Sequence, residues 1–490
     1  MGCISAQNAA DALLLSQYYS GSTARSAGMS GAYGALGGDL SVVNNNPAGL
    51  AIYRGSEFTI TPALNFSNTN SEFDNGKFNE RNTVFLLNNI GYVFTRNLFK
   101  EKGFQSLNFG LAYNRLSDFN SKAYIWSPAA GSSMLDGFVW NANNYGAPLH
   151  YNQLNDFYEG LAYDTYGIDI LPDGTYTNIF IEAGNDYGQA MKRTMSTKGG
   201  INEFSLSMGA NMNHTLFFGA TFGIQSVSYK ESYFHIEEPD FAGLKYFDFS
   251  QDFSLDGTGV NFKAGVIYRP IHMLRLGAAI HTPTRFWLRP YLLTGMETQF
   301  GIAPPDQPDG KTDRQFFYET ESDRFQQRFN IVTPWRYQFS AATVISSLGV
   351  ANIDVEYVNY TTCKILPNSD YGAETGIAET QFKGNLNIRF GAEFRLGPMF
   401  FRGGTAYYGS PYKKEFLPDF DNSHHGTLSY SGGIGFRARN FYMDAAFSHM
   451  NMPQRRAVLY ETFDDIGRLP ISTLMKTSSG KFTLTFGFRL

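Results

Sequence analysis

Few side chains in this chain have types and spacings that would support catalysis or metal binding. The adjacent His424 and His425 in DNSHHG have no third ligand at a spacing that zinc sites use. Cys363 ends an expected strand with no histidine at a nucleophile's spacing, and the serines of GSTARS and GSPY lack the G-x-S-x-G turn of hydrolases. TGVNFKAG lacks both the glycine spacing and the Lys-Ser/Thr of a phosphate loop. The sequence therefore predicts a protein that is not an enzyme and uses no metal and no cofactor.

The strongest pattern is an alternation of apolar and polar residues with period two. It runs through EFTITPALNF, SLNFGLAYNR, FSLSMGANM and NLNIRFGAEFRLG, and it ends the chain in KFTLTFGFRL. In that last segment Phe482 and Phe488 share one face, whereas Thr483 and Arg489 share the other. Such alternation predicts strands with one apolar and one polar face. Nearly every strand has this apolar face, which is more than a sandwich core could bury, so a barrel with a lipid-facing outside and a wet inside fits better.

Composition favours the same fold. The 490 residues include 44 Phe, 30 Tyr and 50 Gly, and only 17% are charged. No run of 18 apolar residues is present, which excludes a helical membrane protein, whereas the mean hydropathy of -0.27 is compatible with a barrel whose lumen is polar. The net charge of -5 and the lack of a Lys/Arg cluster argue against nucleic acid as a partner.

Fourteen segments are candidate strands, an even number as single-chain bacterial barrels require. They are 54–67, 80–96, 104–118, 201–213, 215–232, 254–269, 272–289, 325–345, 349–364, 382–396, 399–410, 426–438, 440–451 and 477–490. Tight joints alternate imperfectly with long polar connections at 119–200, 233–253, 290–324, 365–381 and 452–476. We therefore predict an all-β, 14-stranded antiparallel transmembrane barrel whose short turns face the periplasm and whose long loops face the outside.

Arginines are the charged residues with the clearest placement. They recur on the polar face of the expected strands, at Arg275, Arg389, Arg395, Arg437, Arg439 and Arg489. Inside a barrel they would pair with Glu393 and Asp444 in a polar network that holds a plug. A second interpretation is that one of them captures the carboxylate of a ligand through a charge-assisted pair.

The N-terminal region differs in composition from the rest of the chain. Residues 7–52 are rich in Ala, Gly, Ser and Asn, and they precede the alternating region 53–490. Residues 1–6 are interpreted as the remnant of a signal peptide cleaved after Ala6; a lipidated Cys3 is the alternative. The stretch VVNNNPAGLA is a stiff turn, because Pro47 fixes φ and the asparagines offer hydrogen bonds.

The segment ARSAGMSGAYGALGGDLSVVNNNPAGLA resembles the hatch of the FadL/TodX (OmpP1-like) family of outer-membrane transporters for hydrophobic compounds. The positions that carry the resemblance are Ala24, Gly28, Ala32, Asp39 and Asn46-Pro47-Ala48. The stretch DGTGVNFKAGVIYRPIHMLRLGAAIHTPTRF, residues 256–286, is similar to the family's paired mid-barrel strands. The general character of the sequence resembles that of members from Bacteroidetes.

The resemblance implies a barrel plugged by residues 7–52 in the outer membrane of a Gram-negative bacterium. It implies passive transport of long-chain fatty acids or similar hydrophobic molecules, captured by loops, held in the lumen and released sideways through a kink in the third strand. The implied partners are a fatty acid-like small molecule and outer-membrane lipid, and the implied state is a monomer. Two alternatives stay open, a barrel of the same family that shuttles cargo proteins in a secretion system and a general porin.

Site residues follow from this expectation. Asn46, Pro47 and Ala48 are expected to hold the hatch in place, and Gly110 is expected to permit the kink. The candidate pocket residues are Leu13, Leu14 and Leu15 of the N-terminal segment together with Trp126, Phe138 and Trp140 of the connection 119–200.

Overall fold

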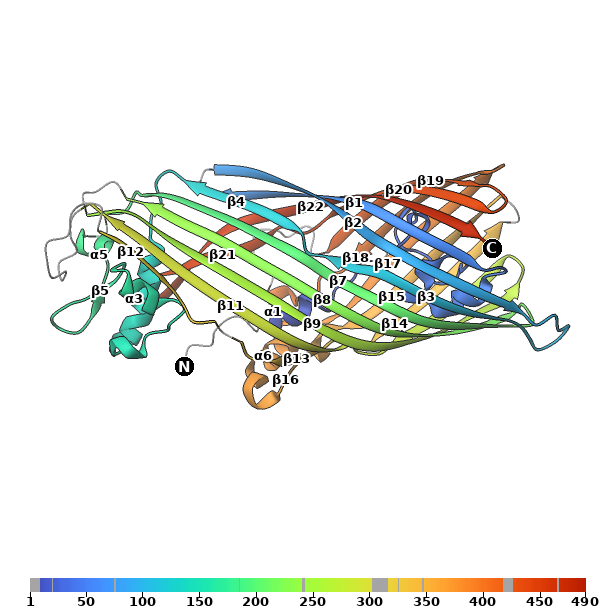
Figure 1. The fold of residues 1–490 in the computed structure, drawn as a ribbon, viewed down its shortest axis with the longest axis horizontal. Coiled ribbons are helices and arrows are strands. Elements are labelled where there is room, and N and C mark those ends of the chain that lie inside the picture. The colour runs from blue at the N-terminus through green and yellow to red at the C-terminus, as the bar shows by residue number, and fades with distance from the viewer. Residues whose placement is uncertain are drawn as a thin grey trace.

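Fourteen antiparallel strands form a closed barrel in the computed structural model (Figure 1). The structure describes residues 9–19, 21–74, 76–184, 186–239, 243–301, 316–324, 326–345, 348–416, 426–464 and 467–490. Cys3, Ala6, His424 and His425 lie outside the described residues. The ring is closed by the ladder between the first and last strands, in which Phe58 pairs with Phe488.

Five of the fourteen strands are interrupted and therefore consist of two or three segments. In ring order the strands are β1 (Glu57–Phe73), β2 (Gly76–Asn97), β3 (Phe104–Asp118) with β4 (Ser121–Ser127), β7 (Ala190–Met212), β8 (Leu216–Glu238), β9 (Leu244–Ile271), β10 (Leu274–His281) with β11 (Arg285–Phe300), β12 (Phe317–Glu321) with β13 (Phe329–Val332) and β14 (Arg336–Ile345), β15 (Gly349–Asn359) with β16 (Lys364–Leu366), β17 (Gly384–Leu396), β18 (Met399–Tyr408), β19 (Thr427–Arg437), β20 (Phe441–Asn451) with β21 (Arg455–Asp464), and β22 (Gly467–Arg489). The predicted strand number is confirmed.

The outside of the barrel carries an apolar belt. Phe109, Phe204, Phe390 and Phe482, which the alternation assigned to the apolar face, are each between 38% and 47% exposed on the outer surface. Their neighbours in sequence, such as Asn108 and Thr483, are buried on the lumen side. A belt of this kind faces lipid in outer-membrane barrels, and the outer membrane is where this architecture places the chain.

Among the described residues, no helix is both long and apolar enough to cross a membrane.

Several strands are longer than the sequence predicts. The predicted connections 233–253, 290–324 and 452–476 contain much of β8, β9, β11, β12, β21 and β22. The ladder between β8 and β9 continues without interruption to Glu237↔Phe247. Above the belt the outward positions of β8 include Ser226, Ser228 and Lys230, so the alternation disappears from the sequence while the backbone pairing continues.

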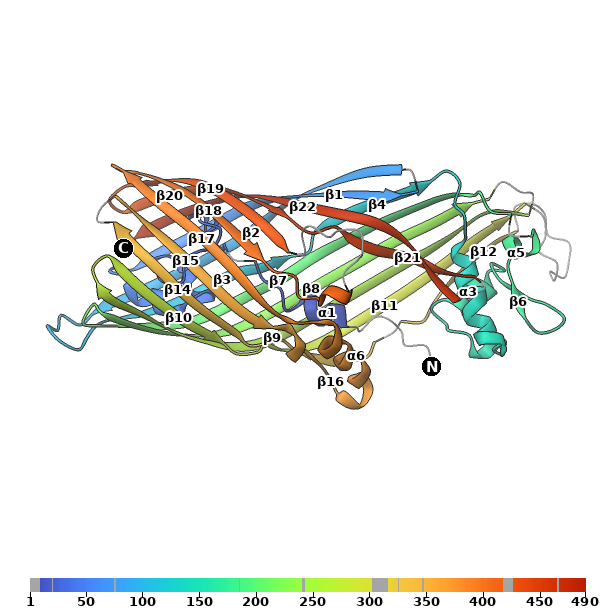
Figure 2. The same ribbon diagram turned by 180° about the vertical axis from the view of Figure 1, so that it is seen from behind.

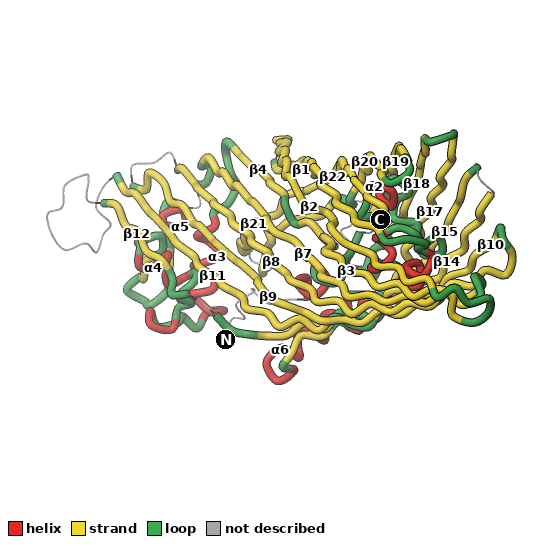
Figure 3. Tube along the Cα trace, turned by 45° about the vertical axis from the view of Figure 1, so that its right-hand side comes forward, coloured by secondary structure: helices red, strands yellow, loops and turns green. Residues whose placement is uncertain are grey.

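The two ends of the barrel differ. At one end the connections after β2, β7, β9, β14, β17 and β19 are short, and the C-terminus lies at this end (Figure 1). The opposite end carries the connection between β4 and β7. The helix α6 (Asn368–Gln381), which connects β16 to β17, lies about midway along the barrel. Short turns face the periplasm in bacterial barrels, so we assign the short-turn end to the periplasm. Figure 3 shows α6 projecting beside the barrel wall.

The connection between β4 and β7 folds into a lid, which we define as residues 128–184 and 186–189. Its elements are α3 (Met134–Asn143), η3 (Asn144–Gly146), η4 (Tyr151–Gln153), α4 (Glu159–Asp164), β5 (Asp169–Ile170), β6 (Tyr176–Thr177) and α5 (Ile179–Glu182). Leu135 and Phe180 of the lid are buried in one apolar cluster with Phe247 and Phe249 of β9. The lid is therefore packed onto the outer end of the barrel, at the left in Figure 1.

The N-terminal segment lies inside the barrel (Figure 2). It contains α1 (Ala9–Leu14), α2 (Ala24–Ala27), η1 (Leu40–Asn44) and η2 (Pro47–Ile52). The last three are close to the periplasmic end, whereas α1 packs at mid-height against α6 and β16. We call residues 21–52 the hatch.

Candidate functional site: the plugged lumen

Asn46 connects the hatch to the barrel wall. Its side-chain oxygen accepts a hydrogen bond from the Ala48 amide at 3.1 Å and so caps η2, in which Pro47 is the first residue. Its side-chain nitrogen donates to the carbonyl of Gly34 at 2.8 Å and to that of Val266 in β9 at 3.3 Å. One buried amide therefore joins two turns of the hatch to one wall strand; that Asn46, Pro47 and Ala48 hold the hatch in place stays a prediction.

Two wall glycines allow the hatch backbone to approach closely. A Cβ atom on Gly219 of β8 would lie 2.2 Å from the carbonyl carbon of Pro47 and 2.4 Å from the nitrogen of Ala48. A Cβ atom on Gly265 of β9 would lie 1.9 Å from the side-chain oxygen of Asn46. No side chain larger than hydrogen fits at these positions while the hatch is seated.

A buried chain of charges ties α2 to three wall strands. Glu393 of β17 accepts hydrogen bonds from Arg25 of the hatch at 2.9 and 2.7 Å and from Arg402 of β18 at 2.6 Å. Arg402 in turn donates to Asp444 of β20 at 2.8 Å, and Arg437 also donates to Asp444. This confirms the predicted network for Arg437, Glu393 and Asp444.

A second set of wall side chains binds hatch backbone. Asp354 of β15 accepts hydrogen bonds from the amides of Tyr33 and Gly34, and Arg389 of β17 donates to the side chain of Asn45. Arg275 donates to the carbonyl of Leu36. Arg389 and Arg275 thus share the predicted structural role, whereas Arg395 and Arg439 are exposed near the periplasmic turns.

A cavity of about 840 Å³ lies in the lumen beyond the hatch. Leu13 and Leu14 of α1 line it on one side, and Phe119 and Tyr229 line it on the wall. Leu15 is fully buried beside the cavity in the cluster that contains Cys363. Further rings and sulfur-containing side chains contribute to the lining: Tyr158, Phe253, Tyr360, Tyr408, Tyr412, Met452 and Met475.

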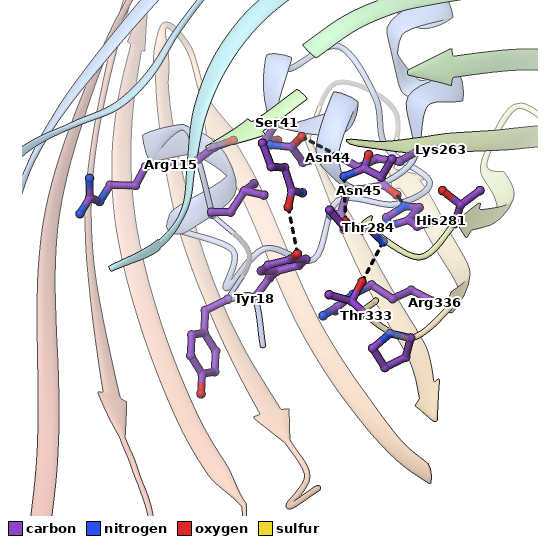
Figure 4. Close-up of a pocket in the computed structure, with 18 of the residues that line it drawn as sticks. Tyr18, Ser41, Asn44, Asn45, Arg115, Lys263, His281, Thr284, Thr333 and Arg336 are labelled. Atoms are coloured by element: carbon purple, nitrogen blue, oxygen red, sulfur yellow. Dashed lines mark hydrogen bonds between the residues drawn. The ribbon is translucent and has the colours of Figure 1, made fainter. Parts of the chain in front are cut away.

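Tyr18 and Tyr19 separate this cavity from a small polar recess of about 60 Å³ between the hatch and the wall (Figure 4). The Tyr18 hydroxyl donates to Gln225 at 3.2 Å, and Lys263 donates to Asn44 of the hatch at 3.1 Å. Lys263 also pairs with Glu203. Hydrogen bonds and an ion pair thus surround the small recess, and the larger cavity is the space that can hold a guest.

The wall is broken between the second and third strands. β2 pairs with β3 only as far as Asn89↔Asn114, and residues 76–88 of β2 pair with β1 alone. β4 pairs with β7. Two lumen-facing hydroxyls of β1 donate hydrogen bonds to this segment: Ser67 to the carbonyl of Asn120, just before β4, at 3.1 Å, and Ser71 to the carbonyl of Tyr124 in β4 at 2.6 Å. The third strand thus leaves its neighbour and turns into the lumen.

The position of this break differs from the predicted one. Gly110 pairs in regular ladders with Val93 and Ser207, and its nearest foreign contact is Leu50 of the hatch. The register shift lies between Arg115 and Ser117, and the strand stops at Asp118. A small residue at position 110 leaves room for Leu50 of the hatch. The interruption of the third strand lies nearer its outer end than Gly110 does.

The structure brings together only part of the predicted pocket. Leu13 and Leu14 line the cavity, as expected. Phe138 is buried in the lid core, 5.7 Å from the ring of Phe249, and Trp140 belongs to the same helix α3. Trp126 of β4 is 40% exposed. None of these three loop residues lines the cavity, because the apolar residues of a long connection pack first on each other.

The aromatic wall of the cavity is the part that sequence reasoning missed. In β8 the odd-numbered positions face the lumen, and they change from Thr221 and Gln225 near the hatch to Val227 and Tyr229 above it. β9 changes in the same way, from Lys263 to Phe253. The sequence did contain a signal for this wall: along the odd-numbered, lumen-facing positions of β8 and β9, polar residues give way to apolar and aromatic ones.

We expect the stability of the lid to fall as the pH rises above the ordinary pKa of a carboxyl group. Burial raises the pKa of Asp136 and of Glu159, although Asp136 accepts a hydrogen bond from Asn178 and Glu159 accepts one from Asn141. Unfolded carboxyls titrate near about 4. Between that value and the raised folded-state pKa the folded lid binds more protons, so its stability decreases with rising pH and is constant above that window.

Hydrogen exchange of residues 134–143 at pH 5 and pH 8 tests this expectation. Protection should be greater at pH 5, and Glu159→Gln should reduce the difference. Greater protection at pH 8 would contradict it.

No group of three or more His, Cys, Asp or Glu side chains within the described residues could hold a metal ion.

A fourteen-stranded barrel with an apolar belt, filled by its own N-terminal segment, defines an outer-membrane protein of the plugged type. Two solved structures share the fold over nearly the whole chain. One is a FadL homologue from Pseudomonas aeruginosa, with 13% sequence identity and a TM-score of 0.55, covering 96% of this chain and 100% of that one. The other is the toluene transporter TodX of Pseudomonas putida, with 11% identity and a TM-score of 0.53, covering 97% and 100%. The chain therefore has the FadL/TodX fold.

Neither a protein-family model nor a curated protein matches the sequence.

Proposed function

We propose that this protein carries long-chain fatty acids or other hydrophobic small molecules passively across the outer membrane. The observation that carries the proposal is the position of the 840 Å³ cavity, whose lining includes Asp118, Phe119, Asn120 and Ser121 at the break in the wall. A guest in the lumen therefore lies next to the place where the wall is unpaired. TodX of Pseudomonas putida, which shares the fold, is a transporter of toluene, a hydrophobic small molecule, and this is consistent with the proposal.

The lining of the cavity suits an elongated guest with an apolar body. Leu13, Leu14, Phe119 and Phe253 offer apolar contact, and tyrosine rings add apolar faces with hydroxyl groups at their edges. Ligand sites are commonly built in this way, with mostly apolar walls and a few polar groups that fix orientation. The charged residues of this lining are Asp11, Asp118, Glu231, Arg455 and Arg456.

Lateral release is supported by the level at which the wall breaks. Phe85 and Leu87 of β2 lie just beyond the last β2–β3 pair, and they are 69% and 39% exposed on the outer surface. The break therefore begins within the apolar belt. A molecule that leaves there would pass from an apolar cavity into lipid without crossing water, whereas straight passage to the periplasm would require removal of the seated hatch.

Placing a charge on α1 should block this route. In Leu14→Asp a carboxylate replaces the isopropyl group of a cavity-lining residue. Uptake should fall about tenfold or more, because desolvating a charge against an apolar guest costs well over ~1.4 kcal/mol. The measurement is uptake of radiolabelled oleate by cells that carry equal amounts of assembled barrel. Leu171→Asp is the matched control, since Leu171 is 40% exposed on the lid and does not line the cavity.

Mass spectrometry of molecules extracted from the purified protein identifies the guest. Recovery of fatty acids from the unaltered protein, and their loss from Leu14→Asp, is the expected result. Equal uptake by the two leucine variants, with no bound hydrophobe in either, would sink the proposal.

A further inference from the structure

The periplasmic mouth of the lumen contains a second pocket, separate from the transport cavity. Its volume is about 240 Å³, and it lies between the end of the hatch and the wall. The lining comes from the chain that leaves η2, from the turn between β2 and β3, and from β3, β7, β8, β9 and β10. Figure 1 shows the hatch and this turn at the same end of the barrel.

Four cationic side chains line this pocket, and no carboxylate does. They are Arg54, Lys100, Arg269 and Arg275. Glu101 follows Lys100 in the turn but does not line the pocket. Within the described parts of the chain, none of the four cations takes part in an ion pair.

The arginines of the pocket differ in this respect from those that hold α2 of the hatch. Nearer the hatch core, Arg25, Arg402 and Arg437 each have a carboxylate partner at 2.6 to 2.9 Å. In the pocket, the Nε atom of Arg275 is buried without a hydrogen-bond partner. Like charges that converge at a partly buried position repel one another, and a bound anion removes that repulsion.

The volume of the pocket and its hydrogen-bond donors indicate which class of anion it would bind. A volume of about 240 Å³ lies below the range of roughly 300–1,000 Å³ that accommodates drug-sized ligands. Guanidinium groups bind phosphate and carboxylate oxygens in a planar two-point fork. Three guanidinium groups and one ammonium group in a small pocket therefore match a compact group with two or more negative charges.

We propose that this pocket binds a phosphate group from the periplasmic side. Arg54 lies two residues after the end of the hatch, and Arg275 donates a hydrogen bond to the carbonyl of Leu36 within it. A phosphate bound between Arg54 and the wall residues Arg269 and Arg275 links the end of the hatch to β9 and β10. Occupancy of the pocket thus stabilises the closed hatch, by the general rule that a ligand of the folded state stabilises it.

Isothermal titration calorimetry on the full chain in detergent micelles tests the proposal. The probes are pyrophosphate, inorganic phosphate and glycerol 3-phosphate, with acetate as the singly charged control at equal ionic strength. We expect one site per chain, tightest for pyrophosphate and undetectable for acetate. Binding of both phosphate and glycerol 3-phosphate indicates that free phosphate and phosphate esters are accepted; binding of the ester alone identifies a headgroup-type ligand.

Variants distinguish anion binding in the pocket from nonspecific attraction of anions to other cationic side chains at this end of the barrel. Arg269→Gln should weaken pyrophosphate binding at least about tenfold, and Arg269→Lys should weaken it less, because it keeps the charge and loses the fork. If Arg269→Gln does not assemble, Arg54→Gln on the exposed chain after the hatch replaces it. Arg439→Gln is the control, since Arg439 is exposed near a turn at the same end and does not line the pocket.

Three results would overturn the proposal. One is equal loss of binding in Arg439→Gln and Arg269→Gln, and another is acetate binding as tightly as pyrophosphate. The third is a glutamate-rich peptide that displaces pyrophosphate at lower concentration, which would identify an acidic protein segment as the ligand.

Discussion

Gly219→Val should dislodge the hatch and convert a closed barrel into a conducting one. The added Cβ atom would lie 2.2 Å from both the carbonyl carbon and oxygen of Pro47 and 2.4 Å from the nitrogen of Ala48. Overpacking of a core usually costs about 1–3 kcal/mol, and here the clash is with backbone that Asn46 fixes by hydrogen bonds on both sides. The wall strand β8 pairs along its whole length with β7 and β9, so the hatch moves and the wall stays.

Single-channel recording in planar bilayers measures this effect. The unaltered protein should be nearly silent, which also distinguishes it from a general porin, and Gly219→Val should show steady ion conductance. Gly403→Val in β18 is the matched control, because no atom lies within 4 Å of a Cβ placed there. A silent Gly219→Val barrel, assembled at normal yield, would show that the hatch seat tolerates a side chain.

Glu393→Gln should loosen the hatch by a different route. The buried carboxylate pairs with Arg25 of the hatch and Arg402 of the wall, and the neutral amide leaves both guanidinium groups without that charge. Removing one partner from a buried ionic network costs about 3–5 kcal/mol. The loss is concentrated in α2, because Arg402 keeps Asp444 whereas Arg25 has no second carboxylate among its described ion pairs.

Hydrogen exchange resolved along the chain measures this effect. Residues 24–31 should exchange faster by a factor of about a hundred or more, as a loss of ~3 kcal/mol in local stability implies, while β8 and β9 keep their protection. Glu72→Gln is the control, since its pair with Lys77 is exposed at 45% and 79% and such pairs contribute about 0–1 kcal/mol. Unchanged exchange in α2 would show that the hydrogen bonds to Asp354 and Asn46 hold the hatch by themselves.

The part of the fold that could be predicted is the part that faces lipid. Phe204, Leu206 and Met208 alternate with small polar residues because one side meets hydrocarbon and the other meets the lumen. That contrast defined fourteen strands. Beyond the belt both sides of the wall meet water or the lid, so the apolar–polar alternation is absent around residues such as Ser228 and Lys230. The end of β8 at Glu238 and the start of β9 at Leu244 could therefore not be predicted from the sequence.

The site was predictable where local chemistry determines position. Asn46 and Pro47 define a capped turn from their side chains alone, and the structure places that turn against the wall. The cavity depends on which strands lie opposite each other, so Tyr229 and Phe253 were not identified. Phe138 was assigned to a pocket for its hydrophobicity, and that same property buries it in the lid.

The contacts between the hatch and the barrel wall involve strands that lie far apart in the sequence. The hatch touches the last strand, where the Ala24 amide donates to Thr485 at 2.8 Å, as well as β8 and β17 in the middle of the chain. The ladder between β1 and β22 joins the first and last strands of the barrel. We infer that residues 21–52 act as a template on which strands from different parts of the chain gather. The hatch, which precedes the first strand, is thus enclosed when that last ladder forms.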